Sequence, residues 1–165
     1  GALGTVTLTL PAATDTLVGK ATTDTLTNKT LTTPVFTRSV INRTSATPLV
    51  AADSGSLVTL NAVGGFDTKL PVPAAGLEFD FVVKAVCTGS DIYTITTNGS
   101  TQNIIHGSTT DAAGTAGDHT AGTAVDVITF ANGQMEIGDR VHMTCDGTLW
   151  YAQAHSNSAT GITFD

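Results

Sequence analysis

Charged side chains are scarce in this sequence. Asp, Glu, Lys and Arg together make up 13% of its 165 residues, which is about half the usual share. The seven basic residues are scattered, and the formal net charge is −7. Because neutralising nucleic-acid phosphates requires clustered Lys and Arg, we expect no nucleic-acid partner. Low charge is instead typical of proteins that place much of their surface against other chains, since the cores of interfaces are depleted in charged residues.

Catalytic motifs are also lacking. No serine lies in a G-x-S-x-G turn, and no segment carries the helical His-Glu motif of metalloproteases. The two glutamates fit solvent-facing positions, and the four histidines show no pair at metal-ligand spacing. We therefore expect no enzymatic activity, no cofactor and no metal, although a histidine that meets its copies on the threefold axis of a trimer is an alternative route to a metal site. These residues are Glu78, Glu136, His106, His119, His142 and His155.

Long apolar runs and disulfide frameworks are lacking as well. No stretch approaches the roughly eighteen consecutive apolar residues of a transmembrane helix, so we expect no membrane-spanning segment. Two cysteines, Cys87 and Cys145, are too few for a disulfide scaffold. Strand alternation puts each on the same face as large apolar residues, which predicts buried free thiols. A disulfide between adjacent strands is the alternative.

What the sequence does contain is a pattern of short strands. Threonine, valine and isoleucine are β-branched and favour strands. Alternating apolar residues make Leu77–Cys87 the strongest predicted strand, and the Asp146-Gly147 pair predicts a hairpin over residues 140–154. We predict an all-β fold, an antiparallel β-sandwich or jelly-roll-like domain over residues 46–165. Further expected elements are strands at Ser56–Asn61, Val125–Phe130 and Met135–Ile137, a hairpin at Tyr93–Ile105 around Asn98-Gly99, a loop at Ala62–Lys69 and a proline-containing edge at Leu70–Ala75.

Aromatic residues are few, at 5% of the chain. Trp150 and Tyr151 follow one another in the last predicted hairpin. Successive strand residues point to opposite faces, so we expect one ring in the core and the other on the outside. An aromatic platform for sugars is the functional alternative, but it normally needs several rings together.

Residues 1–35 are rich in threonine and contain no long apolar run or helical stripe. Ordering about thirty residues costs roughly 30–60 kcal/mol of backbone entropy. Offsetting that cost requires about 1,200–2,400 Å² of apolar burial, which such small side chains cannot supply among themselves. We predict an extended arm and connector over residues 1–45, with a short strand at Val35–Ile41 and with the arm either loose or lying on neighbouring subunits. Its expected anchoring residues are Leu17, Val18, Lys20, Leu26, Asn28, Lys29, Leu31, Pro34 and Val35.

Small residues also dominate the segment Gly107–Ala124. Loops of such length are usually functional or mobile. We expect this segment to be a surface-recognition loop, with Asp111, Asp118 and His119 as its candidate contact residues.

Two segments resemble those of known proteins. The arm sequence LPAATDTLVGKATTDTLTNKTLTTPV, residues 10–35, resembles a segment found in many virion proteins of tailed bacteriophages, including fibres, where it precedes a β-rich domain. The sequence IGDRVHMTCDGTLWYAQA, residues 137–154, resembles a hairpin that commonly ends small β domains of phage structural proteins. The sequence LPVPAAGLEFDFVV, residues 70–83, is similar to a passage found upstream of that hairpin.

The resemblance implies a structural component of a bacteriophage virion that forms a homotrimer. The expected type is a capsid decoration (cement) or head-fibre protein, whose arm anchors to the major capsid protein or other virion subunits and stabilises the shell. The alternative is a tail-fibre or tail-tip domain that binds a glycan on the host surface. In either case the expected location is the virion, at the capsid surface or tail, after assembly in the host cytoplasm.

Overall fold

Strands make up nearly all of the regular structure in the computed structural model of this protein. The model describes residues 30–98, 104–114, 116–120 and 123–165. The chain divides into two units, Gly1–Phe36 and Thr37–Asp165. The elements of the second unit are β1 (Val40–Arg43), the 3-10 helix η1 (Ala51–Asp53), β2 (Leu57–Leu60), β3 (Phe66–Lys69), β4 (Ala75–Val83), β5 (Tyr93–Thr96), β6 (Ile105–Asp111), β7 (Ala116–His119), β8 (Val127–Phe130), β9 (Arg140–Asp146), β10 (Trp150–Ser156) and β11 (Ile162–Phe164).

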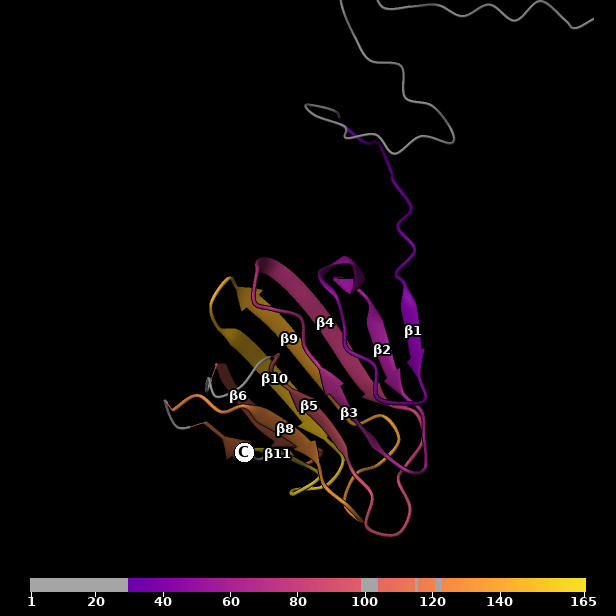
Figure 1. The fold of residues 1–165 in the computed structure, drawn as a ribbon, viewed down its shortest axis with the longest axis vertical. Helices are drawn as coiled ribbons and strands as arrows, with labels where there is room; N and C mark the ends of the chain where they lie inside the picture. The colour runs from indigo at the N-terminus through magenta and orange to yellow at the C-terminus, as the bar shows by residue number, and fades with distance from the viewer. Residues whose placement is uncertain (1–29, 99–103, 115, 121–122) are drawn as a thin grey trace, which may run out of the picture. The chain divides into compact units, whose positions relative to one another are not determined.

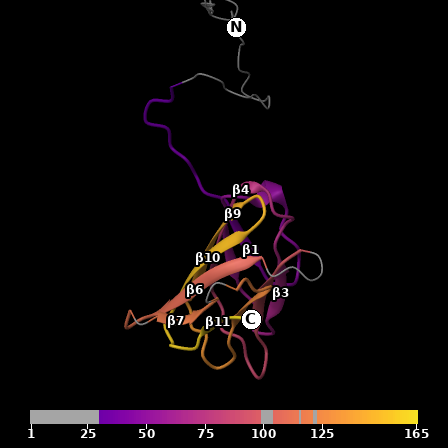
Figure 2. The same ribbon diagram turned by 90° about the vertical axis from the view of Figure 1, so that its left-hand side faces the viewer.

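Two sheets overlap to form a sandwich (Figures 1 and 2). The larger has seven strands in the order β1-β2-β4-β9-β10-β6-β7, and the smaller has four in the order β11-β8-β5-β3. The predicted all-β sandwich is confirmed. Both sheets are mixed rather than purely antiparallel, because β1–β2, β2–β4, β6–β10 and β3–β5 pair in parallel. No helix in the described ranges is long and apolar enough to cross a membrane.

The core lies between the sheets and follows from strand alternation. In β4, β9 and β10 every second residue is buried, so each strand contributes one apolar face. Trp150 is fully buried and Tyr151 is 45% exposed, which confirms the prediction that their rings face opposite sides. The buried hydrophobic residues of these strands are Leu77, Phe79, Phe81, Val83, Val141, Met143, Cys145, Trp150, Ala152 and Ala154.

The hairpin predicted at residues 140–154 is confirmed by the antiparallel pairing of β9 with β10. One glycine lies just before the first strand of this hairpin and another lies in its turn. Gly138 and Gly147 have φ values of +98° and +110°, in the region that favours glycine because it lacks a Cβ. Between them, Asp139 is fully buried. Its carboxylate accepts hydrogen bonds from the Glu136 N–H, the Ser156 hydroxyl, and the backbone and side-chain N–H groups of Asn157.

The second predicted hairpin, at Tyr93–Ile105, is wrong. β5 pairs with β3 and β8 in the smaller sheet, whereas β6 begins at Ile105 in the larger one. Tyr93 and Ile105 are both fully buried, so each segment contributes to the core from a different layer. Burial of both segments outweighs the local preference of Asn98-Gly99 for a tight turn.

Three other local predictions require correction. Phe66–Lys69 is strand β3 rather than loop, and Asp67 accepts hydrogen bonds from the Thr94 and Thr96 hydroxyls of the neighbouring strand. The proline-containing segment that follows is a connection into β4 rather than an edge strand, and its Leu70 is fully buried. Met135–Ile137 lies in the irregular connection between β8 and β9 rather than in a strand, and the Glu136 N–H donates to Asp139 there.

The predicted connector contains a strand of the sandwich. β1 lies at Val40–Arg43, later than the expected Val35–Ile41, and pairs in parallel with β2. Arg38 precedes it, and its guanidinium donates hydrogen bonds to the backbone oxygens of Gly55 and Ser56. The larger sheet therefore begins before residue 46, where the sequence placed the start of the domain.

The segment predicted as a surface loop, Gly107–Ala124, also contains strands. Its first residues belong to β6, and β7 pairs with β6 in antiparallel fashion. Small and β-branched residues are compatible with both a loop and a strand, and pairing with a neighbouring strand decides between the two. Asp111 therefore ends a strand, and Asp118 and His119 lie within one.

Both cysteines are free and buried, as predicted. Burial raises the pKa of the Cys87 thiol, which keeps it protonated and unreactive. The nearby Tyr93 hydroxyl accepts from the Ala62 N–H and lies within hydrogen-bonding distance of the Ala62 and Ala85 oxygens. The polar groups around the Tyr93 hydroxyl therefore find their hydrogen-bond partners within the core, which indicates a structural role for Cys87 and Tyr93.

Candidate functional site

The outer face of the seven-stranded sheet carries carboxylate, imidazole, hydroxyl, amide and aromatic side chains on neighbouring strands. Two rows of residues cross β4, β9, β10 and β6 in register. Because side chains on one face of neighbouring strands lie about 4.5–5.5 Å apart, each row forms a continuous surface. The first row is Glu78, Thr144, Tyr151 and His106, and the second is Asp80, His142, Gln153 and Ser108.

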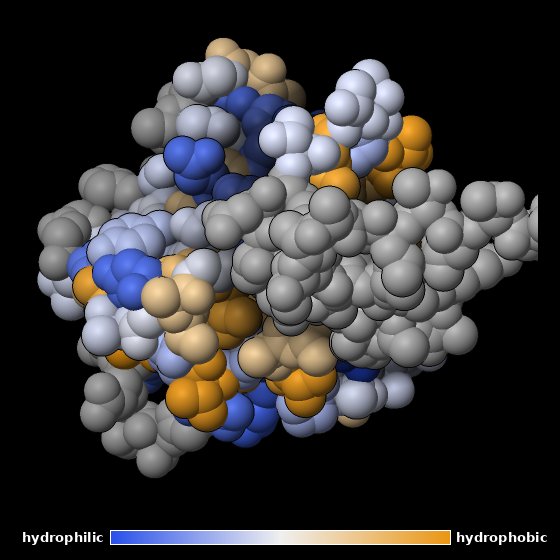
Figure 3. Space-filling model, turned by 90° about the horizontal axis from the view of Figure 1, so that it is seen from above, coloured by the Kyte–Doolittle hydropathy of each residue, from blue (hydrophilic) through white to orange (hydrophobic). Residues whose placement is uncertain are grey.

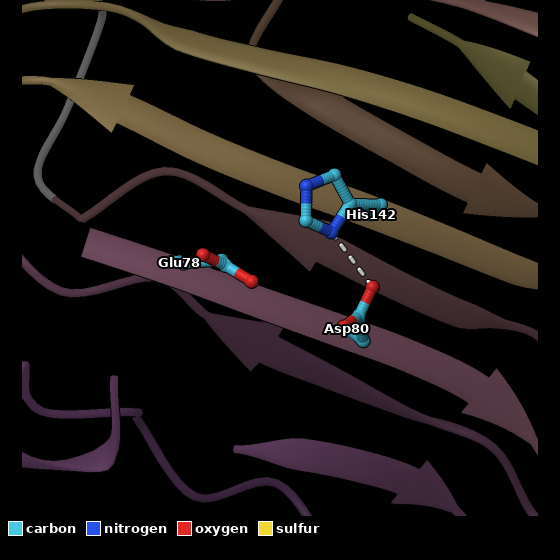
Figure 4. Close-up of side chains that lie close together, drawn as sticks. All are labelled: Glu78, Asp80 and His142. Carbon is cyan, nitrogen blue, oxygen red and sulfur yellow. Dashed lines mark hydrogen bonds and ion pairs between the residues drawn. The ribbon is translucent and has the colours of Figure 1, made fainter. Parts of the chain in front are cut away.

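At one end of these rows, Glu78, Asp80 and His142 form a cluster (Figure 4). The two carboxylates come from alternate positions of β4, and the imidazole comes from the adjacent β9. The His142 Nδ1 lies 2.8 Å from Asp80 Oδ1, and one ligand atom from each of the three side chains lies within 4.8 Å of the others. The cluster thus combines one nitrogen and two oxygen donors on one face of the sheet.

Arg38 completes the surroundings of Asp80. Its guanidinium forms an ion pair with Asp80 Oδ2, while Asp80 Oδ1 faces the imidazole of His142. Both oxygens of this carboxylate are therefore engaged, and its orientation is fixed from two sides. The Glu78 side chain is exposed, and its carboxylate makes no hydrogen bond or ion pair with any residue in the described ranges.

An aromatic pair lies at the other end of the first row. The rings of His106 and Tyr151 stack with centroids 6.5 Å apart and an interplanar angle of 22°. The Tyr151 hydroxyl donates to Asp146 Oδ2 at 3.0 Å, and this hydrogen bond raises the pKa of the tyrosine. The N–H groups of Leu149 and Thr148 donate to the same carboxyl and hold its pKa well below the ordinary value. Asp146 thus remains ionised and fixes the orientation of the Tyr151 ring.

Two shallow hollows adjoin along this face. One, of about 440 Å³, lies over β6, β9 and β10 near the aromatic pair. The other, of about 290 Å³, extends toward Arg140 and His155. Both are lined by His142 and Gln153, so they form one trough with mainly neutral polar walls.

The exposed large apolar residues elsewhere on the sandwich come from separate positions along the chain. In the view of Figure 3, hydrophobic groups in orange are interspersed with hydrophilic groups in blue. Isolated apolar side chains are normal on protein surfaces and mark no site by themselves. Exposed examples in the sandwich are Val50, Val63, Val72 and Ile137.

The structure describes only some of the site residues predicted from the sequence. Of the predicted arm anchors, Leu31, Pro34 and Val35 are described and are exposed; Leu17, Val18, Lys20, Leu26, Asn28 and Lys29 lie outside the described residues. Asp111 ends β6, where its side chain accepts from the Ala113 N–H. Asp118 and His119 lie in β7, and only their backbone is described. The recognition role predicted for these three residues stays a prediction.

Compared with protein-family models, with curated proteins and with solved structures, the chain gives no match in any of the three. No relative therefore assigns a role to any of these side chains. Sequence reasoning missed the Glu78–Asp80–His142 cluster because His142 is 62 residues from Asp80. The available signal was that each residue lies on the polar face of a strongly alternating strand, but only the strand register shows that the two faces meet.

Proposed function

We propose that this protein is a structural component of a bacteriophage virion, a trimeric capsid decoration or head-fibre protein. Its N-terminal arm anchors to the major capsid protein or other virion subunits, and its sandwich lies on the particle surface. The resemblance of residues 10–35 and 137–154 to phage virion proteins supports this function. So does the low content of charged residues, 13% of the chain, since surfaces buried between subunits are poor in charge.

The observation that carries the proposal is the contrast between the two units of the chain. All buried hydrophobic residues of the described ranges lie between Leu49 and Phe164, within the second unit. In the described end of the first unit, Val35 and Phe36 are 93% and 82% exposed. Two adjacent apolar side chains next to a threonine-rich arm offer contact area to a partner. One arm from each of three chains multiplies modest contacts into firm attachment.

Deleting residues 1–36 is expected to abolish attachment to the particle while the sandwich still folds. The core of Thr37–Asp165 is retained in this variant, so its melting temperature should stay within a few degrees of that of the full chain, a change of less than about 1 kcal/mol. Attachment is measured by co-sedimentation with purified particles that lack the protein.

A matched variant replaces Val35 and Phe36 with serine in the full chain. Both side chains are exposed, so folding should be unaffected while attachment weakens. If the truncated sandwich co-sediments as well as the full chain, the arm is not the anchor and the decoration proposal fails.

The trough on the larger sheet favours a second candidate function, that of a tail-fibre or tail-tip domain that binds a host glycan. Its lining combines the fixed Tyr151 ring with hydroxyl, amide and imidazole groups. Aromatic rings present an apolar face that polar side chains can complement at the edges. This surface differs from the segment at residues 107–124 that the sequence singled out, although β6 contributes to both.

This second candidate predicts that the full chain binds one class of glycan on an array. Tyr151→Ala should reduce binding at least about tenfold, because burying a large apolar side chain is worth about 1.5–3 kcal/mol. Tyr151 is 45% exposed, so its loss should leave the fold intact. A Val63→Ala variant, altered at an exposed side chain that does not line the trough, is the control. Equal binding by both variants would argue against the trough as a glycan site.

A further inference from the structure

The Glu78–Asp80–His142 cluster has the composition and spacing of a metal site. One ligand atom from each side chain lies within 4.8 Å of the others. Figure 4 shows the two carboxylates on one strand and the imidazole reaching toward them from the next. Direct pairing of Asp80 with His142, and of Glu78 with Thr144, fixes these positions through the sheet backbone. We propose that this cluster binds a first-row divalent transition metal such as Zn²⁺.

The donor set decides which class of metal fits. Imidazole nitrogen suits Zn²⁺ and its neighbours, whereas Mg²⁺ and Ca²⁺ prefer oxygen ligands alone. A tetrahedral Zn²⁺ with bonds of about 2.0–2.1 Å places its ligands about 3.3 Å apart. The Asp80 Oδ1 to His142 Nδ1 distance of 2.8 Å is close to that edge. The Glu78 side chain is exposed and has no partner among the described residues. Its rotation can bring a carboxylate oxygen from within 4.8 Å of the other two ligand atoms to coordinating distance.

Metal binding requires the proton of the hydrogen bond to leave the His142 Nδ1. Asp80 Oδ1 and His142 Nδ1 now share one hydrogen bond, and a metal between them requires Nδ1 to be unprotonated. The histidine then carries its proton on Nε2, or releases one to solvent if it was doubly protonated. Three protein ligands leave the fourth tetrahedral position for water, which is the arrangement of an open zinc site.

Charge and orientation also favour a cation. With neutral imidazole, two carboxylates and the Arg38 guanidinium leave the cluster with a net charge of −1. Arg38 engages Asp80 Oδ2, so Oδ1 remains the oxygen directed at His142. An outer partner that orients a ligating carboxylate in this way typically strengthens metal sites. The side chains of Asp80 and His142 are 27% and 41% exposed, which leaves the ion a path from solvent.

Isothermal titration calorimetry of the chelator-treated full chain with ZnCl₂ tests the proposal. The expected result is saturable binding of one Zn²⁺ per chain. Glu78→Gln and His142→Gln should each weaken it at least about tenfold, the lower end of the loss seen when even an outer-shell partner is removed. Glu78→Gln is the cleaner variant, because the Glu78 carboxylate has no partner in the described ranges whose loss would perturb folding.

His155→Gln is the matched control. This histidine lies on β10, on the same face of the sheet but outside the cluster, so Zn²⁺ affinity should not change. A second readout is the side-chain ¹⁵N resonance of His142, which should shift on adding Zn²⁺ and not on adding Mg²⁺. The proposal is overturned if the full chain shows no saturable binding, or if Glu78→Gln and His142→Gln bind Zn²⁺ as tightly as His155→Gln does.

Discussion

Replacing Asp139 with alanine is expected to lower the free energy of unfolding by about 3–5 kcal/mol, because four hydrogen bonds to one buried carboxylate are lost at once. Asp139 is fully buried. Its two oxygens accept from the Glu136 N–H, the Ser156 hydroxyl and two N–H groups of Asn157, at distances of 2.6–3.1 Å. These bonds join the segment before β9 to the end of β10, so their loss affects both strands at the open end of the hairpin.

Smaller changes at the same site should cost less. Asp139→Asn keeps one oxygen acceptor and the side-chain size. Ser156→Ala removes the hydrogen bond to Asp139 and the one that the Ser158 N–H donates to the Ser156 hydroxyl, together worth about 1–3 kcal/mol. Asp91→Ala, at an exposed aspartate, is the control and should change stability by less than about 0.5 kcal/mol. Urea denaturation followed by the fluorescence of Trp150, the one tryptophan of the chain, measures all four. If Asp139→Ala proves as stable as Asp91→Ala, the carboxylate does not hold the hairpin.

Trp150→Ala should be about as damaging, at about 3–5 kcal/mol, because the largest side chain of the core leaves a cavity between the sheets. Trp150 is fully buried, and its ring centroid lies 6.0 Å from that of Phe79. Trp150→Phe should cost clearly less. It preserves much of the ring contact and removes the indole N–H, a buried donor without a hydrogen-bond partner in the described part of the chain.

Tyr151→Ala is the neighbouring control for this series. It removes an aromatic ring from the next residue of the same strand, but from the outer face, so its cost should stay below about 1 kcal/mol. Because the tryptophan is lost, thermal unfolding is followed by circular dichroism. Equal destabilisation by Trp150→Ala and Tyr151→Ala would mean that the two faces of β10 do not differ as described.

The positions of the segment at residues 137–154 have separate roles in the hairpin. Gly138 adopts a positive φ, Asp139 accepts the buried hydrogen bonds, and Val141 packs in the core. Asp146 and Gly147 form the turn, and Trp150 fills the space between the sheets. Each of these positions serves folding.

The sequence by itself determined the fold class, the part of β4 from Leu77 to Val83, the last hairpin, and which of their residues face inward. It extended the predicted strand to Cys87, whereas β4 ends at Val83. It also predicted the buried free thiols and the opposite faces of Trp150 and Tyr151. These features depend on local properties: the alternation of apolar residues with period two, and a turn pair whose preferred conformation closes a hairpin. Neighbouring residues carry this information, so it can be read without knowing which strands pair.

The tertiary structure alone decided the pairing. It placed β5 and β6 in different sheets, made strands of Phe66–Lys69 and part of Gly107–Ala124, and brought Asp80 beside His142. Strand partners and register are set by which combination buries the most apolar surface across the whole sandwich. A shift of one residue would turn Asp80 or His142 to the other face. The cluster on the larger sheet therefore exists only because distant segments share one register.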